Sequence, residues 1–393
     1  MLLTCLSSLP ALALWRSGSL PWSPDLVPAA HSLKPELDAA AADAAGQAAL
    51  AAALAHVCRE RLRHFLDGVL AYRRSPLQRE LADPPVIWQD GAARLLDYGA
   101  GCGLPDTAPV LLAVPSLVNR AFILDLTAEC SLMRWLAGNG VRPLLLDWGS
   151  PGAVERAFTL TDYVAGPLES AVALVAQRYG RRMTLLGYCM GGLLALAAAL
   201  RRPAEIDRLV LLATPWDFHA DVESARRLSM LATVLGPLID QLGELPVDVL
   251  QALFFGLDPM QGPRKFEAFA RHQESKAKMR HFVATEDWLN DGVPLAGPVA
   301  RECLFGWYGA NSPALGRWRI AGRPVEPAAF TRPALVIVPA QDRIVPPGSA
   351  VALAEALPHA ELFQPPVGHI GMMVGSRAQS LVWQKLADWC RGD

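Results

Sequence analysis

The chain has 393 residues, of which 52% are hydrophobic and 19% are charged. This balance is typical of a folded globular enzyme and argues against a disordered or fibrous chain. The formal net charge is -2, and no lysine- or arginine-rich stripe is present, so we expect no binding to nucleic acid. The seven cysteines are scattered and include no Cys-x-x-Cys pair, which argues against a disulfide framework or a zinc site and favours a reducing cytoplasm.

The N-terminal part of the chain divides into two segments by composition. The apolar residues at the start follow no Lys or Arg, whereas a signal peptide carries positive charge there. No uninterrupted apolar run reaches the roughly 20 residues that a membrane helix needs. Residues 1–33 are punctuated by Pro and Ser and are expected to be poorly ordered. Residues 34–75 are rich in Ala, with Leu at helical spacing, which predicts one or two amphipathic helices.

Next along the chain, two short apolar runs flank Asp90-Gly91, a dipeptide typical of a hairpin turn. Short strands then alternate with helical stretches, notably 162–179 and 191–200. The predicted strands are APVLLAV (108–114), VRPLLLDW (141–148), MTLLG (183–187), IDRLVLLAT (206–214), PALVIVPA (333–340) and AELFQ (360–364). This alternation predicts a mostly parallel sheet with helices on both faces.

A long interval without a clear strand interrupts that rhythm. Residues 217–332 contain Leu- and Ala-rich helical pieces, which predicts a helical cap inserted over the sheet. The α/β core is therefore expected in two parts, 76–216 and 333–393.

The stretch LLGYCMGGLLALAAAL contains a cysteine at a predicted strand-to-helix corner. A nucleophile elbow requires this context, together with small flanking residues, because the strand and helix approach closely. Gly187 and Gly191 supply those residues around Cys189, whose alternative role is a buried structural cysteine. The helix that follows presents free N–H groups, which favour a thiolate and later an oxyanion. The backbone N–H groups of Met190 and Val118 are the predicted oxyanion donors.

A nucleophile elbow is completed by an acid and a base that follow it in the chain. Asp342 and His369 each come after a predicted strand, where the carboxyl ends of parallel strands gather functional groups. His369 is expected to take the thiol proton, and Asp342 to hold the imidazole. Asp147 also ends a strand but precedes the nucleophile. Asp217 is expected to cap the first helix of the insertion.

These sequence blocks resemble those of the polyhydroxyalkanoate synthases, which are cysteine enzymes of the α/β-hydrolase fold. The resemblance covers roughly residues 85–392. It rests on PSLVNRAFILDL, LLLDWGSPG, TLTDYVAGPL, GYCMGG, TPWDFH, AQDRIVPP and VGHIGMMVG, in the family's order.

The resemblance implies an acyltransferase that polymerises 3-hydroxyacyl groups from coenzyme A, with the thioester as substrate and no cofactor. It implies that Cys189 carries the growing polyester chain and that His369 activates it. Asp342 is implied either to orient His369 or to activate the incoming hydroxyl. The products are implied to collect as cytoplasmic granules. The chain length suggests the shorter synthases that work with a separate partner subunit, and a homodimer is the other assembly considered.

Two other functions use the same motifs. Dienelactone hydrolases carry a similar cysteine elbow and triad, but their chains are much shorter and lack a large cap. A thioesterase or polyester depolymerase would differ only in using water as acceptor. A non-catalytic scaffold protein has no need of all three groups in this order. Trp288, Trp307 and Tyr308 are expected either to shield the thioester and form a dimer interface or to pack in the core.

Overall fold

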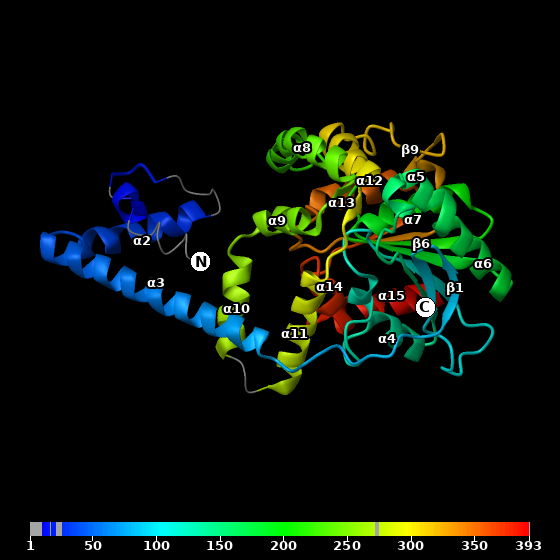
Figure 1. The fold of residues 1–393 in the computed structure, drawn as a ribbon, viewed down its shortest axis with the longest axis horizontal. Helices are drawn as coiled ribbons and strands as arrows, with labels where there is room; N and C mark the ends of the chain where they lie inside the picture. The colour runs from blue at the N-terminus through cyan, green and yellow to red at the C-terminus, as the bar shows by residue number, and fades with distance from the viewer. Residues whose placement is uncertain (1–9, 16, 21–25, 272–274, 393) are drawn as a thin grey trace. The chain divides into compact units, whose positions relative to one another are not determined.

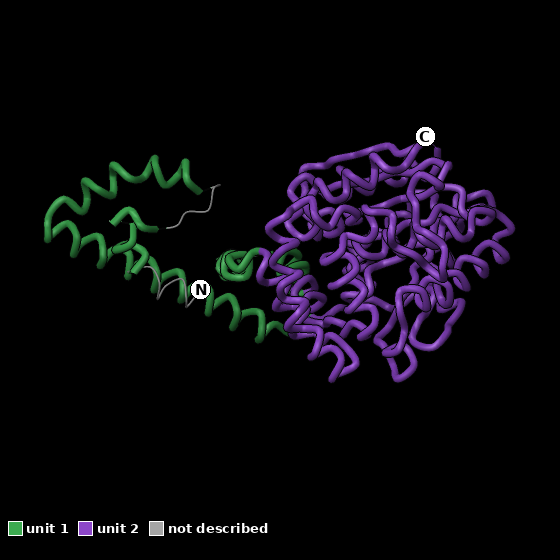
Figure 2. The backbone as a smooth tube through the Cα atoms, turned by 90° about the horizontal axis from the view of Figure 1, so that it is seen from above, with its two compact units in different colours: residues 1–77, 258–283 green, residues 78–257, 284–393 purple. Residues whose placement is uncertain are grey.

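The computed structural model describes residues 10–15, 17–20, 26–271 and 275–392. The chain divides into two compact units, which Figure 2 draws in separate colours. Unit 1 comprises residues 1–77 and 258–283, and unit 2 comprises residues 78–257 and 284–393. The interval predicted as one cap, 217–332, is therefore divided between the two units. Within the described ranges, no helix combines the length and apolarity that crossing a membrane requires.

Unit 1 is helical. It contains α2 (Val27–Ala40), α3 (Ala44–Arg73), α10 (Gln261–Arg271) and the beginning of α11 (Lys276–Asn290). Helix α2 begins inside the segment predicted as poorly ordered, whose residues 1–9, 16 and 21–25 lie outside the described ones. Helices α3 and α10 pack so closely at Gly68 that a Cβ there would lie 2.0 Å from the carbonyl oxygen of Phe266. The Phe266 ring packs against Phe65 and Tyr72.

Unit 2 is built on an eight-stranded sheet with the order β1-β2-β4-β3-β5-β6-β11-β12. Its strands are β1 (Val86–Asp90), β2 (Ala93–Asp97), β3 (Val110–Val114), β4 (Arg142–Asp147), β5 (Met183–Tyr188), β6 (Ile206–Leu212), β11 (Ala334–Ile337) and β12 (Ala360–Phe363). The predicted hairpin is confirmed, since β1 pairs antiparallel with β2, and β2 pairs antiparallel with β4. The five remaining pairings are parallel, and all six strands predicted after the hairpin are present.

The alternation of side chains along the strands divides the core between the two faces of the sheet. In β3, Leu112 belongs to the apolar cluster formed with α6 (Glu169–Tyr179), α7 (Met190–Arg201) and α13 (Pro347–Ala356). Its neighbour Leu111 belongs to the cluster formed with α4 (Leu132–Gly138), α14 (Gly371–Val374) and α15 (Gln384–Arg391). The predicted layers of helices on both faces are confirmed, and Figure 1 shows them around the sheet.

One predicted helix, over 162–179, is interrupted. Helix α5 (Leu160–Tyr163) leads into a π-helical turn at Val164–Leu168 before α6 begins. Gly166 inside this turn has φ -100° and ψ -105°, outside the helical range. The cause is Pro167, which lacks a backbone N–H and whose ring clashes with the preceding turn of a regular helix.

The part of the insertion that belongs to unit 2 is mostly helical. It contains α8 (Val222–Leu242), α9 (Val247–Leu257), the end of α11, α12 (Gly297–Arg301) and a π-helix at Glu302–Gly309. Two-residue strands form the pairs β7 (Glu244–Leu245) with β8 (Leu295–Ala296) and β9 (Arg319–Ile320) with β10 (Arg323–Pro324). The predicted cap at Asp217 is wrong, because α8 begins later and the side chain of Asp221 accepts a hydrogen bond from the Ser224 N–H at 3.2 Å.

Candidate active site

The turn between β5 and α7 has the geometry of a nucleophile elbow. Cys189 lies between the strand and the helix with φ 55° and ψ -127°, a strained conformation for a residue with a side chain. A Cβ on Gly187 would lie 2.3 Å from the Cα of Gly192, and a Cβ on Gly192 would lie 1.9 Å from the Thr214 hydroxyl oxygen. Small residues around Cys189 are therefore required, because strand and helix backbones nearly touch.

The first residues of α7 face the loop that follows β3. A Cβ on Gly191 would lie 2.2 Å from the carbonyl oxygen of Val114 and 2.5 Å from that of Pro115. Met190 is the first residue of α7, where backbone N–H groups have no partner within the helix. The Val118 N–H donates a hydrogen bond to the Ser116 hydroxyl oxygen at 3.1 Å. Both oxyanion donors stay predictions, and Val118 must exchange its present partner for a substrate oxygen to serve as one.

Asp342 and His369 form a buried pair. The Nδ1–H of His369 donates to Oδ2 of Asp342 at 2.7 Å, and the side chains are 7% and 0% exposed respectively. The other carboxylate oxygen of Asp342 accepts hydrogen bonds from the N–H groups of Ile344 and Val345 at 2.8 and 2.9 Å. Because a carboxylate only accepts, this arrangement fixes the Nδ1–H tautomer and leaves Nε2 to receive a proton.

The electrostatics of His369 link this pair to Cys189. Burial alone lowers the pKa of the imidazole, because it disfavours the charged form. Negative charge on Cys189 and hydrogen bonds to Asp342 and to the thiol outweigh burial and raise the pKa of His369 to about 10. The imidazole therefore favours the protonated form whenever Cys189 is the thiolate, which is the reactive form of cysteine.

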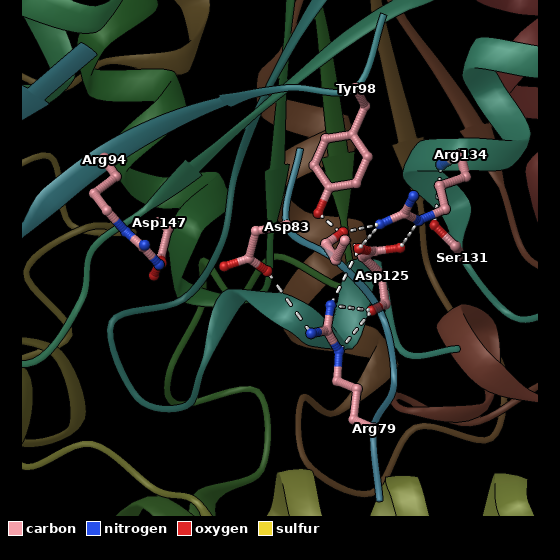
Figure 3. Close-up of polar contacts among 9 residues, drawn as sticks. Arg79, Asp83, Arg94, Tyr98, Asp125, Ser131, Arg134 and Asp147 are labelled. Atoms are coloured by element: carbon pink, nitrogen blue, oxygen red, sulfur yellow. Dashed lines mark hydrogen bonds and ion pairs between the residues drawn. The ribbon is translucent and has the colours of Figure 1, made fainter. Parts of the chain in front are cut away.

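Asp147, and His219 as another histidine that follows a predicted strand, are the rivals of Asp342 and His369, and both have other partners. Asp147 pairs with Arg94 at 2.6 Å across the neighbouring strands β2 and β4, as Figure 3 shows. Its second oxygen accepts the Gly149 N–H at 3.0 Å. His219 lies at 2.9 Å, through its Nε2, from the carbonyl oxygen of Tyr308. Asp147 thus joins β4 to β2, and His219 joins the segment after β6 to the π-helix at Glu302–Gly309.

The block NRAFILDL contains a second buried carboxylate, Asp125, which is fully buried. Figure 3 shows it between two arginines and a tyrosine. It accepts hydrogen bonds from Arg134 at 2.8 and 3.1 Å, from Arg79 at 3.2 Å and from the Tyr98 hydroxyl at 2.9 Å. Oδ1 accepts one of these bonds and Oδ2 accepts three, so Asp125 ties the loop after β3 to α4 and to the segment before β1.

The aromatic residues named in the sequence occupy different positions. Trp307 is buried, with its ring stacked on Phe218 and edge-on to Trp318. The indole N–H of Trp288 donates to the carbonyl oxygen of Arg120 at 2.8 Å. Burial, followed by negative charge on Cys189, raises the pKa of Tyr308, so this ring lies within electrostatic reach of the thiol. Trp307 is a core residue, and Tyr308 is close enough to Cys189 for the charge of the thiolate to affect its pKa.

Sequence reasoning did not single out Tyr188, the residue directly before Cys189. Its hydroxyl donates to the carbonyl oxygen of His369 at 3.2 Å, a contact between positions 181 residues apart. Its position directly before the candidate nucleophile was the one feature of the sequence that could have indicated a role for Tyr188.

Comparisons with known proteins place this geometry in a family. The model of the alpha/beta hydrolase fold matches residues 124–376, which include all three candidate catalytic side chains. A poly(3-hydroxyalkanoate) polymerase subunit PhaC from Synechocystis is 30% identical over 342 residues, covering 84% of this chain and 90% of the relative. The chain belongs to the PhaC family. Another PhaC subunit, from Allochromatium vinosum, is 29% identical over 308 residues, covering 77% of this chain and 86% of the relative.

A solved structure confirms the fold of this PhaC family member. A soluble variant of monoglyceride lipase from Saccharomyces cerevisiae, in complex with a substrate analog, aligns with a TM-score of 0.53 and 15% identity. The alignment covers 81% of this chain and 98% of the lipase. At this identity the likeness concerns the α/β-hydrolase fold alone, and the chemistry must be argued from the residues at the elbow.

Proposed function

We propose that this chain is an acyltransferase that polymerises 3-hydroxyacyl groups from coenzyme A through a thioester on Cys189. The observation that carries the proposal is the buried Asp342–His369 pair in electrostatic contact with a cysteine on a strained elbow. Membership in the PhaC family supports the same reaction.

The first half-reaction loads the enzyme. His369 takes the Cys189 thiol proton, and the thiolate attacks the carbonyl carbon of the 3-hydroxyacyl-CoA thioester. A new carbon–sulfur bond forms while the carbonyl electrons move to oxygen, where backbone N–H groups at the start of α7 stabilise the charge. The tetrahedral intermediate collapses, the bond to the CoA sulfur breaks, and His369 returns its proton to the leaving thiolate. Free CoA and an acyl-cysteine result.

The second half-reaction extends the polymer. The hydroxyl of an incoming 3-hydroxyacyl-CoA gives its proton to His369 and attacks the carbonyl carbon of the chain held on Cys189. The ester bond forms, the bond to the Cys189 sulfur breaks, and the thiolate is left paired with the imidazolium. The chain, longer by one unit, is then a CoA thioester, and the thiolate takes it back as in the first half-reaction with release of CoA. Asp342 holds the His369 tautomer in both halves. A thiol suits this cycle because exchange between two thioesters is nearly balanced energetically.

The proposed assembly and location follow from the family. The relatives are named as polymerase subunits, and we propose that this chain also acts with a second chain, either another copy or a separate partner subunit. Association with the polyester granule in the cytoplasm is part of the same proposal.

The test is to incubate purified protein with 3-hydroxybutyryl-CoA while following CoA release and the size of the acyl product. Polymer that is formed by the wild type and lost in Cys189→Ala supports the synthase. CoA release that yields only free hydroxy acid makes the protein a thioesterase on the same residues. Asp147→Asn serves as a control, because its carboxylate pairs with Arg94 and the proposed mechanism does not use it.

A further inference from the structure

Tyr188 occupies a position that joins the nucleophile to the base. It is the last residue of β5, and its side chain is buried with 3% exposure. Alternation along the strand directs Tyr188 and Leu186 into the apolar cluster that also contains Val367 and Met372, on either side of His369. The strand that leads into Cys189 therefore packs directly against the loop that carries the imidazole.

Tyr188 contacts both the backbone and the ring of His369. Its hydroxyl donates to the His369 carbonyl oxygen at 3.2 Å. Its ring centroid lies 5.2 Å from that of the imidazole, with an angle of 34° between the planes. A buried hydroxyl that makes this bond is costly to leave unpaired, so the contact restrains the loop.

Asp342 restrains the imidazole at one atom only, Nδ1. A single hydrogen bond at Nδ1 still allows the ring to tilt, and tilting moves Nε2 away from the thiol. The tyrosine ring limits that tilt from one side, while its hydroxyl fixes the backbone to which the imidazole is attached.

We propose that Tyr188 is a positioning residue that holds the His369 imidazole in line with Cys189. This inference rests on the proposed function, in which His369 must exchange a proton with the thiol in both half-reactions. Tyr188 acts through His369, and its role is to hold the distance and angle of that proton transfer.

Two substitutions separate the hydroxyl from the ring. Tyr188→Phe removes only the hydroxyl and is expected to lower kcat about tenfold with KM little changed, because misplacement of a catalytic group by a fraction of an ångström costs rate. Tyr188→Leu also removes the ring and is expected to lower kcat about a hundredfold. Tyr98→Phe is the matched control, because Tyr98 is another buried tyrosine whose hydroxyl makes a hydrogen bond at 2.9 Å, in this case to Asp125.

The decisive readout is the pH dependence of Cys189 alkylation by iodoacetamide in the full-length protein. The reacting form is the thiolate, which a well-placed imidazolium stabilises. We expect alkylation of Tyr188→Phe to begin at a higher pH than in wild type, and that of Tyr98→Phe to follow the wild-type profile. The melting temperature of each variant is measured in parallel. A loss of fold would lower it in Tyr188→Phe and in Tyr98→Phe alike, whereas the positioning role displaces the alkylation profile of Tyr188→Phe alone.

The outcomes separate this inference from the proposed function. A lower kcat at unchanged KM, together with a displaced alkylation profile in Tyr188→Phe alone, supports the positioning role. A wild-type profile in Tyr188→Phe overturns it, whatever happens to kcat, and so does a rise in KM without a change in kcat. If the wild type assembled with its partner chain releases no CoA, the proposed function fails, while the alkylation profile still tests the contact between Tyr188 and His369.

Discussion

Replacing Asp342 with Asn tests whether Asp342 determines which nitrogen of His369 carries the proton. One oxygen of Asp342 accepts the N–H groups of Ile344 and Val345, and the other accepts Nδ1–H of His369. In Asp342→Asn the amide oxygen keeps the two backbone donors, so the NH₂ group faces the imidazole. Nδ1 must then accept, the proton moves to Nε2, and the nitrogen that should take the Cys189 proton is blocked.

The expected loss of activity in Asp342→Asn follows from the loss of the hydrogen bond between His369 and the charged carboxylate. A hydrogen bond to a charged group contributes about 1.5–3 kcal/mol, which corresponds to about 10- to 150-fold in rate, and a wrong tautomer in a Ser-His-Asp site costs about 10⁴-fold. We therefore expect kcat/KM for CoA release to fall at least about 100-fold in Asp342→Asn. The control Asp147→Asn, which loses only the pairing with Arg94, should stay within about threefold of wild type.

The same substitution has a pH signature in stability. The pKa of His369 is raised from 6.5 to about 10, so its protonated form stabilises the folded state. That contribution is fully present below pH 6.5 and is lost as the pH rises through about 10. Urea unfolding should find wild type more stable than Asp342→Asn. The difference in free energy of unfolding should be largest below pH 6.5 and should narrow toward pH 10. An activity of Asp342→Asn within a few-fold of wild type, or a stability difference that does not depend on pH, would refute this reasoning.

Three further substitutions test separate parts of the site. Cys189→Ala removes the largest influence that raises the pKa of His369, so NMR titration should find that pKa lower than in wild type; an unchanged value contradicts the ion pair. Gly191→Ala forces a methyl onto the Val114 carbonyl and should cost about 3 kcal/mol of stability in urea unfolding. Gly138→Ala, where a Cβ meets nothing within 4 Å, is its control. Asp125→Asn leaves two arginines without their carboxylate and should also cost about 3 kcal/mol, while Cys189 alkylation stays at the wild-type rate; equal stability contradicts the account of that cluster.

The parts of the fold that local patterns encode were predictable. Strands buried on both faces are continuous apolar runs, so β3 to β6 and β11 are visible in the sequence. The edge strand β12 is partly exposed and was predicted from a shorter run. The order of Cys189, Asp342 and His369 after such strands led to the acid–base pair, because parallel strands deliver their carboxyl ends to one edge. The candidate catalytic residues could therefore be predicted where their identity depends on their order along the chain.

Contacts between distant segments were not predictable. Nothing local in the sequence indicates that α10 packs against α3, which is why the insertion was expected to be one cap rather than divided between two units. The hydrogen bond from Tyr188 to His369 joins residues 181 positions apart and depends on tertiary packing. The interruption at Gly166-Pro167 was signalled by the proline, but the surrounding helical pattern outweighed it.

The central claim is that Cys189 carries the polymer as a thioester. Its most direct test is intact-protein and peptide mass spectrometry after incubation of the full chain with 3-hydroxybutyryl-CoA, with Cys189→Ala treated in parallel. The account predicts a ladder of repeating 3-hydroxybutyryl masses on the wild-type peptide that contains Cys189, removed by hydroxylamine and absent from the variant. Polymer formation by Cys189→Ala at the wild-type rate, or acyl groups attached at another residue, would contradict it.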